Sequence, residues 1–381
     1  MHHLIRKILY QEAHRQQQTV ELIASENFAS ESVMQLCGSV FTNKYAEGYP
    51  GKRYYNGCEH MDEIETLAIE TLKKLYGCQF ANVQPHSGAN ANIAVFNAFL
   101  KPGDVILGMD LASGGHLTHG ASVNMSGKIY QSYSYGVDND GLLDYNSIEE
   151  QALQVKPKML IAGASAYPRQ IDWKRMRDIA DKVNAILMVD MAHYSGLIAG
   201  GVYDNPCDYA DVVTSTTHKT LRGPRGGIIL WNNADYTRKI NSSIFPGTQG
   251  GPLMNIIAAK AQAFLEADTP EFKDYSRRVV ENAQTMCDVL RERGFSIQTD
   301  GTDSHIILVN LSNHKLSGRE AADLLEQNEI TVNKNGVPND QRSFVETSGI
   351  RLGTAAETTL GHDKEWFIRL SHRITDILNN E

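Results

Sequence analysis

Residues 210–227 read ADVVTSTTHKTLRGPRGG, and this stretch decides how the rest of the chain is interpreted. It begins as an apolar, β-branched run, which is typical of a buried strand, and it breaks into polar residues and glycines after Thr216. Lys219 therefore stands at the mouth of a buried strand, where its ammonium group loses hydration. Such a position is unfavourable unless a partner or a chemical task compensates for the lost water, so Lys219 is a candidate functional residue.

Four further apolar runs of similar length lie along the chain, and helical patterns separate most of them. These runs are DVILGMD (104–110), PKMLIAGAS (157–165), AILMVDMAH (185–193) and GGIILW (226–231). Strands that are apolar throughout predict a mostly parallel sheet with helices covering both of its faces. The connection from residues 210–218 to residues 226–231 is too short for a crossover helix, so these two strands are predicted to pair antiparallel.

The same patterns divide the chain into three parts. Residues 61–269 are predicted to form a large α/β domain, and residues 270–381 a smaller C-terminal α+β domain. Residues 1–60 precede the alternating pattern and are predicted to form an N-terminal arm.

Composition narrows the classes of function. The chain has 381 residues and a formal net charge of −9, which argues against nucleic acid or a membrane surface as the main partner. Its five cysteines are scattered, without C-x-x-C spacing, as expected in a reducing compartment and not in a disulfide scaffold or structural zinc site. No apolar run reaches membrane-spanning length. We therefore expect a cytoplasmic protein that acts on small molecules.

Polar residues gather where the predicted strands end, which is where open α/β sheets bind ligands. Asp190 ends one strand and Lys219 follows the next. A neutral lysine amine can bind an aldehyde covalently, and a carboxylate can keep a pyridine nitrogen protonated. The helix start at Ser87 and Gly88 offers backbone N–H groups to a phosphate. These features predict pyridoxal 5'-phosphate as cofactor, whereas the HLTH run (116–119) lacks the glutamate of a zinc-hydrolase motif and predicts no metal.

Longer motifs resemble one family over most of the chain. The chain is similar to serine hydroxymethyltransferase, a fold-type I pyridoxal-phosphate family with a seven-stranded, aminotransferase-like sheet. The resemblance is carried by ELIASENFAS (21–30), TNKYAEGYPGKRYY (42–55), VQPHSGANAN (83–92), GGHLTHG (114–120), VDMAH (189–193), TTHKTLRGPRGG (216–227), FPGTQGGPLM (245–254), VNKNGVPND (332–340) and SGIRLGTA (348–355). It implies a transferase that interconverts serine and glycine and passes the one-carbon unit to tetrahydrofolate, its co-substrate.

The resemblance also implies which residues hold the cofactor. Lys219 would be the Schiff-base lysine, Asp190 would pair with the pyridine nitrogen, and His116 would stack on the ring. The other implied cofactor positions are Ser165 and His193 near the phenolic oxygen, Ser87, Gly88 and His218 at the phosphate, Thr216, and Tyr45 and Gly251 contributed by the neighbouring subunit.

Substrate positions follow from the same resemblance. Arg351 would clamp the carboxylate of the amino acid with the help of Ser25, because a guanidinium binds a carboxylate through two parallel hydrogen bonds. Glu47 is the implied acid/base at the serine hydroxyl, with Tyr55 beside it. The implied folate-binding positions are Glu47, Tyr54, Leu111, Gly114, Leu117 and Asn335.

Subunit sharing is implied as well. Tyr45 and Glu47 lie far before the sheet in sequence, which agrees with an active site completed by a second copy of the chain. The resemblance therefore implies a homodimer or a tetramer of dimers, with residues 1–60 taking part in the dimer contact.

The chain departs from the family pattern at several positions. Ala89 replaces a usual serine at the phosphate, and Ser113 replaces a usual histidine beside the pterin position. The other departures are Tyr194 and Ser195 for a small aliphatic pair, Ala355 for a proline, Leu360 for an arginine, and a C-terminus that ends after one helix.

These departures leave two alternatives to the folate-dependent transferase. One is a folate-independent aldolase or transaldolase acting on β-hydroxy amino acids, or a relative that uses α-methylserine. The retained Glu47, Tyr54 and Asn335 count against this alternative, whereas Ser113 and Leu360 favour it. The other is a catalytically silent paralogue that acts as a binding subunit.

Overall fold

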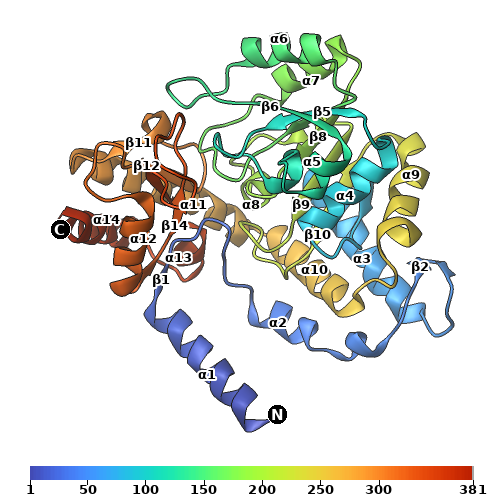
Figure 1. Ribbon diagram of the computed structural model, residues 1–381. Coiled ribbons are helices and arrows are strands. Elements are labelled where there is room, and N and C mark those ends of the chain that lie inside the picture. The colour runs from blue at the N-terminus through green and yellow to red at the C-terminus, as the bar shows by residue number, and fades with distance from the viewer. Residues whose placement is uncertain (380–381) are drawn as a thin grey trace.

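A seven-stranded sheet forms the centre of the computed structural model, which describes residues 1–379 (Figure 1). Its strand order is β4-β10-β9-β8-β7-β5-β6. The strands are β4 (Phe80–Asn82), β5 (Val105–Met109), β6 (Gln131–Tyr135), β7 (Met159–Ala162), β8 (Ile186–Asp190), β9 (Val212–Thr216) and β10 (Gly227–Trp231). All five apolar runs form strands of this sheet, so the predicted fold class is confirmed.

Strand β10 runs antiparallel to both of its neighbours, β9 and β4, whereas β5 to β9 run parallel to one another. The predicted antiparallel pairing of β9 with β10 is confirmed, with Thr216 opposite Gly227. The apolar runs did not reveal β4 and β6, the two edge strands. Both strands are partly exposed, and β6 carries polar residues such as Ser132 and Ser134, so neither forms a continuous apolar run.

Alternate residues of the central strands enter two separate cores, one on each face of the sheet. In β7, Leu160 shares a core with Leu72 and Trp173, whereas the next residue, Ile161, shares the other core with Phe96. Helices cover both faces, as the apolar strands predict. These helices are α3 (Glu59–Tyr76), α4 (Gly88–Phe99), α5 (Met125–Ile129), α6 (Tyr145–Val155), α7 (Trp173–Lys182), α8 (Ser195–Ala199), α9 (Thr237–Ser242) and α10 (Met254–Ala267).

The C-terminal part contains a second, antiparallel sheet in the order β11-β12-β15-β14. Its strands are β11 (Ser296–Ile297), β12 (Ile306–Asn310), β14 (Asn333–Asn335) and β15 (Gly349–Gly353). The helices of this part are α11 (Pro270–Glu292), α12 (Gly318–Gln327), α13 (Ala355–Thr359) and α14 (Lys364–Asn379). Figure 1 shows this part beside the large sheet, with α11 leading from one to the other.

The N-terminal segment joins both parts. Strand β1 (Val20–Glu21) pairs in parallel with β13 (Ile330–Thr331), so this segment packs on the C-terminal part. Helix α2 (Glu31–Cys37) contacts α10, and the short strands β2 (Gly48–Tyr49) and β3 (Lys52–Arg53) form a hairpin. Helix α1 (His3–Gln18) projects away from the rest of the chain, and none of its residues is buried (Figure 1). Within residues 1–379, no helix is both long and apolar enough to cross a membrane.

Candidate active site

The loop after β9 fixes the backbone of Lys219. The side-chain amide of Asn27 and the backbone N–H of Arg222 both donate to the Lys219 carbonyl, each at 3.0 Å. Arg222 adopts a left-handed conformation with φ +59°, and its guanidinium lies 4.3 Å from the ring centroid of Tyr275. These contacts fix the position of the Lys219 backbone, from which the buried side chain extends.

Close backbone contacts explain the glycines of the same loop. A Cβ atom on Gly226 would lie 2.4 Å from Cε of Lys260, and one on Gly227 would lie 2.2 Å from the Ser87 carbonyl oxygen. Neither neighbour is free to move, since one is a buried side chain and the other is backbone. Only glycine therefore fits at these two positions.

Lys260 is a buried cation that ties the ends of β4 and β10 together. Its ammonium donates to the carbonyls of Val83, Pro85 and Gly227 at 2.6, 3.0 and 2.8 Å, which matches its three donors with three acceptors. Burial lowers the pKa of Lys260 to about 7. The lysine thus fixes the backbone that leads to the predicted phosphate position at Ser87.

Lys219 and Asp190 line one cavity at the carboxyl ends of β8 and β9. We call it the Lys219 cavity, and it is lined by Gly88, Ala89, His116, His119, Ala164, Ser165, Asp190, Ala192, His193, Thr216 and Lys219. Seven of the residues expected at the cofactor from the sequence are therefore brought together. Ser87 and His218 adjoin this cavity in sequence without lining it.

Asp190 is held as an anion inside the cavity wall. Its Oδ2 lies 3.1 Å from Nε2 of His119 and accepts from the Asn92 amide at 2.9 Å, while its Oδ1 accepts from the Ala192 N–H at 3.1 Å. Burial alone would raise the pKa of Asp190, but the hydrogen bond from His119 and the neighbouring His116 outweigh it and keep that pKa well below its usual range. The carboxylate is therefore ionised at neutral pH.

The side chains of His116, His119 and Asp190 also bring their potential ligand atoms within 4.8 Å of one another. The hydrogen bonds of Asp190 and the contact between His116 Nδ1 and the Thr118 hydroxyl at 2.8 Å engage these same groups. The cluster therefore fits a hydrogen-bonded support for the carboxylate.

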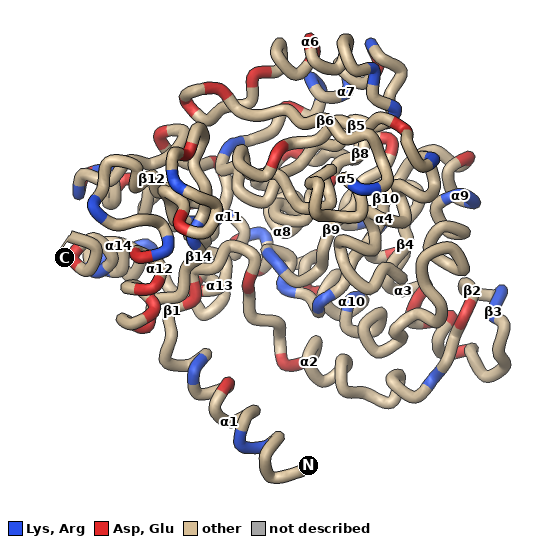
Figure 2. Tube along the Cα trace, in the orientation of Figure 1, with Lys and Arg blue, Asp and Glu red and all other residues tan. Residues whose placement is uncertain are grey.

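Burial prepares Lys219 for chemistry as a neutral amine. Burial lowers its pKa to about 8, the charge of Asp190 opposes this shift, and Arg351 and Arg225 add to it. Figure 2 shows Lys and Arg segments close together between α8, β9 and α10, in the region of the loop that follows β9. An amine with this pKa is neutral in about a tenth of molecules at pH 7, far more than an ordinary lysine, and nucleophilic attack on an aldehyde requires the neutral form.

The predicted phosphate position lies at the start of α4. The Ser87 hydroxyl accepts from the Asn90 N–H at 3.2 Å as the N-cap, and a Cβ atom on Gly88 would lie 2.6 Å from the Thr216 methyl carbon. His86 Nε2 and His218 Nδ1 are buried without a hydrogen-bond partner among residues 1–379. The backbone N–H groups at the start of α4 fit an anionic group such as a phosphate.

Arg351 lies on β15 of the C-terminal sheet and contacts Ser165 of the Lys219 cavity without lining the cavity itself. Its Nη1 donates to the Ser165 carbonyl at 2.5 Å and its Nε to the Asn333 amide oxygen at 3.0 Å. Burial lowers the pKa of Arg351 to about 10, so it remains a cation at neutral pH. Ser25 lies in the N-terminal segment, where the carbonyl of its neighbour Ala24 contacts His305 Nε2 at 3.1 Å.

Four predicted site residues form a separate group. The rings of Tyr45 and Tyr55 have centroids 5.3 Å apart, and a Cβ atom on Gly251 would lie 3.0 Å from the Tyr45 ring. Glu47 lies beside Gly250 and raises the pKa of the Tyr55 phenol through its charge. None of Tyr45, Glu47, Tyr55 and Gly251 lines the Lys219 cavity of the same chain.

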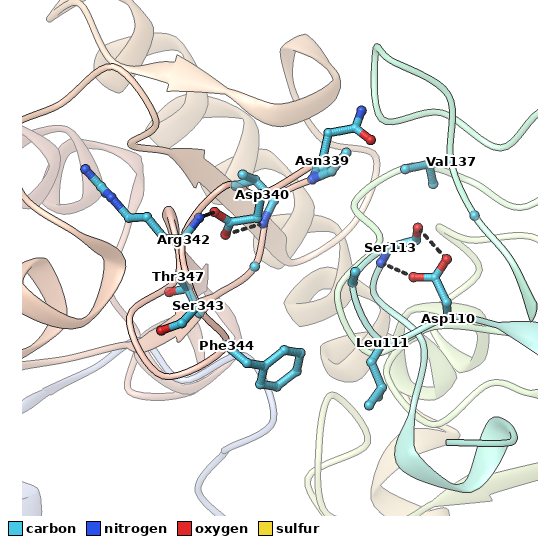
Figure 3. Close-up of a pocket in the computed structure, with 15 residues that line it drawn as sticks. Asp110, Leu111, Ser113, Val137, Asn339, Asp340, Arg342, Ser343, Phe344 and Thr347 are labelled. Atoms are coloured by element: carbon cyan, nitrogen blue, oxygen red, sulfur yellow. Dashed lines mark hydrogen bonds between the residues drawn. The ribbon is translucent and has the colours of Figure 1, made fainter. Parts of the chain in front are cut away.

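Two larger pockets share Asp110, Leu111 and Phe344, and one of them shares His116 and His119 with the Lys219 cavity. The Leu117 pocket, of about 530 Å³, is lined by Leu111, His116, Leu117 and apolar neighbours including Val123. The Leu111 pocket, of about 600 Å³, lies between the end of β5 and the loop of residues 336–347 (Figure 3).

Of the predicted folate positions, Leu111 and Leu117 line these pockets, whereas Glu47, Tyr54, Gly114 and Asn335 line neither. Gly114 accepts from the Ser165 N–H at 2.7 Å, and Asn335 directly precedes the 336–347 loop. Tyr54, by contrast, is 75% exposed and packs edge-to-face against Phe245, away from both pockets.

Of the departures from the family pattern, Ser113 lines a pocket, whereas Tyr194, Ser195 and Leu360 line neither the Lys219 cavity nor the two larger pockets. Ser113 lines the Leu111 pocket, where its hydroxyl donates to Asp110 at 3.1 Å (Figure 3). Tyr194 is fully buried and lies outside the cavity lining, with its hydroxyl donating to the Tyr167 carbonyl and its ring stacked on Tyr203. Ser195 is also buried, and Leu360 is exposed after α13.

Sequence reasoning missed four residues that support the site. Asn92 and His119 bind Asp190, Lys260 ties two strand ends, and His305 contacts His193. A signal existed for Lys260, because it interrupts the otherwise apolar run NIIAAKAQAF. The partners of the other three residues are distant in sequence, so only the fold reveals them.

Comparison with known proteins identifies the family of this chain. A family model described as serine hydroxymethyltransferase matches residues 2–374. The chain belongs to the serine hydroxymethyltransferase family. It is 58% identical over 376 residues to a serine hydroxymethyltransferase of Legionella pneumophila (strain Corby), covering 98% of this chain and 90% of the relative. It is 59% identical over 368 residues to one of Wolbachia sp. subsp. Drosophila simulans (strain wRi), covering 96% and 87%. The resemblance seen in the sequence is confirmed.

The pKa of Lys219 gives the first prediction. The rate at which cofactor-free protein attaches covalently to pyridoxal phosphate will rise with pH and level off above pH about 8, because only the neutral amine attacks and Lys219 loses its proton there. Stopped-flow absorbance measures this rate. A plateau reached only near pH 10.5, the ordinary value for lysine, would contradict the assignment.

Arg351 gives the second prediction. Arg351→Lys will weaken serine binding by roughly ten- to a hundredfold, because one ammonium cannot replace two parallel guanidinium hydrogen bonds, and it will change cofactor affinity little. Equilibrium titration of the holoenzyme with serine measures the effect. Arg319→Lys, at an exposed arginine of α12, is the matched control. Unchanged serine affinity in Arg351→Lys would remove this residue from the carboxylate role.

Proposed function

We propose that this protein is a pyridoxal-phosphate-dependent transferase that interconverts serine and glycine and passes the one-carbon unit to tetrahydrofolate. The observation that carries the proposal is the meeting of a buried lysine of lowered pKa and an ionised carboxylate in one cavity, in a chain of the serine hydroxymethyltransferase family. Both relatives described above bear the name serine hydroxymethyltransferase.

The residues of the Lys219 cavity fit pyridoxal phosphate at each of its ends. Lys219 supplies the amine for its aldehyde, Asp190 the carboxylate for its pyridine nitrogen, and the start of α4 the N–H groups for its phosphate. When bound, the cofactor supplies an electron-withdrawing ring that stabilises negative charge at the α-carbon of the amino acid. Ala89 lines the cavity without a hydroxyl, and the Ser87 hydroxyl donates to the Asn90 amide oxygen at 2.9 Å, so the backbone N–H groups of α4 are the donors proposed for the phosphate.

The protein then binds and orients the amino acid and moves its protons. Arg351 holds the carboxylate, with Ser25 beside it in the proposed arrangement. Lys219 would hold the aldehyde end of the cofactor, and the lowered pKa of its free amine would let it take up and return a proton near neutral pH. Glu47 is the proposed acid/base at the serine hydroxyl, with Tyr55 next to it.

The tetrahydrofolate site is proposed at the pockets that share Leu111. The Leu117 pocket offers apolar walls for a flat ring and meets the cavity at His116, which lines both. Ser113, where the family usually has a histidine, lines the adjoining Leu111 pocket. This departure within the proposed folate site is the one that favours the folate-independent alternative.

A second copy of the chain completes the site in this proposal. Tyr45, Glu47, Tyr55 and Gly251 stand together but outside the Lys219 cavity of their own chain, and α1 buries none of its residues. A two-fold symmetric dimer brings each such group to the cavity of the partner. We also propose that the dimer is cytoplasmic, because all five cysteines are free.

Dependence on folate tests the proposed function. Cleavage of serine to glycine will accelerate strongly when tetrahydrofolate is added to the holoenzyme, because the acceptor removes the one-carbon unit from the site. Glycine formation is measured with and without tetrahydrofolate, using serine, threonine and α-methylserine side by side. Turnover that is indifferent to folate would favour the aldolase alternative. The lack of a cofactor absorption band in the purified protein would favour the silent paralogue.

Mixed dimers test the shared site. Lys219→Ala and Glu47→Ala will each be inactive alone, but coexpression will restore about a quarter of wild-type activity, because half of the dimers then carry one intact site. Two affinity tags isolate the mixed species. Its inactivity would mean that Lys219 and Glu47 serve a site within one chain.

A further inference from the structure

His305 is a buried histidine beside the Lys219 cavity to which the proposed reaction assigns no task. It directly precedes β12 and is 0% exposed, and its backbone carbonyl accepts from the Thr354 N–H at 3.3 Å. Its ring lies next to that of His193, with centroids 5.6 Å apart and planes inclined by 17°. His193 lines the cavity, so His305 stands directly behind a residue of the site.

The contacts of His305 determine which of its nitrogens carries the proton. Its Nε2 lies 3.1 Å from the Ala24 carbonyl oxygen, which can only accept, so Nε2 must be protonated. Its Nδ1 is buried and has no hydrogen-bond partner among residues 1–379, as expected for the bare nitrogen of a neutral ring. Burial lowers the pKa of His305 to about 3, which agrees with a neutral ring.

The same proton determines the tautomer of His193. The Nδ1 of His193 lies 3.4 Å from the protonated Nε2 of His305, so this Nδ1 is an acceptor, since two N–H groups would repel one another there. Burial lowers the pKa of His193 well below its usual range, so its ring is also neutral. A neutral imidazole with an accepting Nδ1 carries its proton on Nε2.

We propose that His305 is a positioning residue that locks His193 in the tautomer with the proton on Nε2, so that His193 presents an N–H donor to the Lys219 cavity. The bond to Ala24 makes the lock rigid, because it ties the His305 ring to the segment that carries Ser25. The proposal rests on the proposed function only in naming the acceptor, which is the phenolic oxygen of pyridoxal phosphate.

The fixed tautomer of His193 affects how tightly the cofactor binds. A donor fixed at Nε2 stabilises negative charge on an oxygen in the cavity, whereas the opposite tautomer would place a lone pair there and repel that charge. Loss of the lock will therefore weaken binding of pyridoxal phosphate, but not of a cofactor analogue without the phenolic oxygen.

The experiment compares two probes on cofactor-free protein: pyridoxal 5'-phosphate and 3-deoxypyridoxal 5'-phosphate, which lacks the phenolic hydroxyl. His305→Leu removes the donor at similar volume, and His305→Gln keeps an N–H donor near the position of Nε2. His314→Leu is the matched control, because His314 follows the same strand but stacks on Phe295 outside the cavity. Affinities are measured by equilibrium titration, and circular dichroism confirms that each variant is folded.

The expected result is a selective loss. His305→Leu will weaken binding of pyridoxal 5'-phosphate on the order of tenfold while leaving the deoxy analogue nearly unchanged. His305→Gln and His314→Leu will bind both probes like the wild type. Equal weakening of both probes in His305→Leu would reveal a purely structural role and overturn the proposal, as would a Gln variant as weak as the Leu variant.

A second measurement does not depend on variants that fold. ¹⁵N NMR of histidine-labelled, cofactor-free wild type will show His193 as the neutral Nε2–H tautomer. Finding the proton on Nδ1 would overturn the proposal. Wild-type protein that binds neither probe would instead contradict the proposed cofactor and leave the tautomer measurement to decide the role of His305.

Discussion

Burial of the Lys219 amine next to the Asp190 carboxylate is the constraint that the rest of the site serves. The amine must lose its proton readily, whereas the carboxylate must keep its charge in the same cavity. The fold resolves this conflict by giving Asp190 hydrogen bonds from His119, Asn92 and a backbone N–H, while it anchors Lys219 through its backbone alone. Desolvation then outweighs the charge of Asp190 and lowers the pKa of the amine.

Further buried polar side chains, behind the residues that line the cavity, fix the backbone of the site. Lys260 ties the strand ends that carry the phosphate position, and His305 ties His193 to the N-terminal segment. Each of these side chains bonds to backbone carbonyls, which are rigid once the sheets have formed. Contacts with the main chain therefore fix the positions of the side chains at the site, as a pre-organised active site requires.

The two sheets supply different groups to the proposed site. The large sheet holds the groups assigned to the cofactor, and Arg351 of the C-terminal sheet donates to the carbonyl of Ser165, which lines the same cavity. The Asn27 amide links the N-terminal segment to Lys219 as well. Arg351 thus takes part in a contact between the two sheets, and the Leu111 pocket lies along the same boundary (Figure 3).

The sequence by itself determined the sheet, the antiparallel β9–β10 pair, the family and the residue types at each strand end. It did so because apolar runs and glycine spacing are local patterns that the backbone must follow. Only the tertiary structure decided that β4 and β6 form the edges, that Asn92 and His119 support Asp190, and that Tyr45 and Glu47 stand apart from their own cavity. These features depend on contacts between segments that are distant along the chain. Such contacts produce no periodic pattern in the sequence, so the direction of a side chain across them cannot be predicted from it.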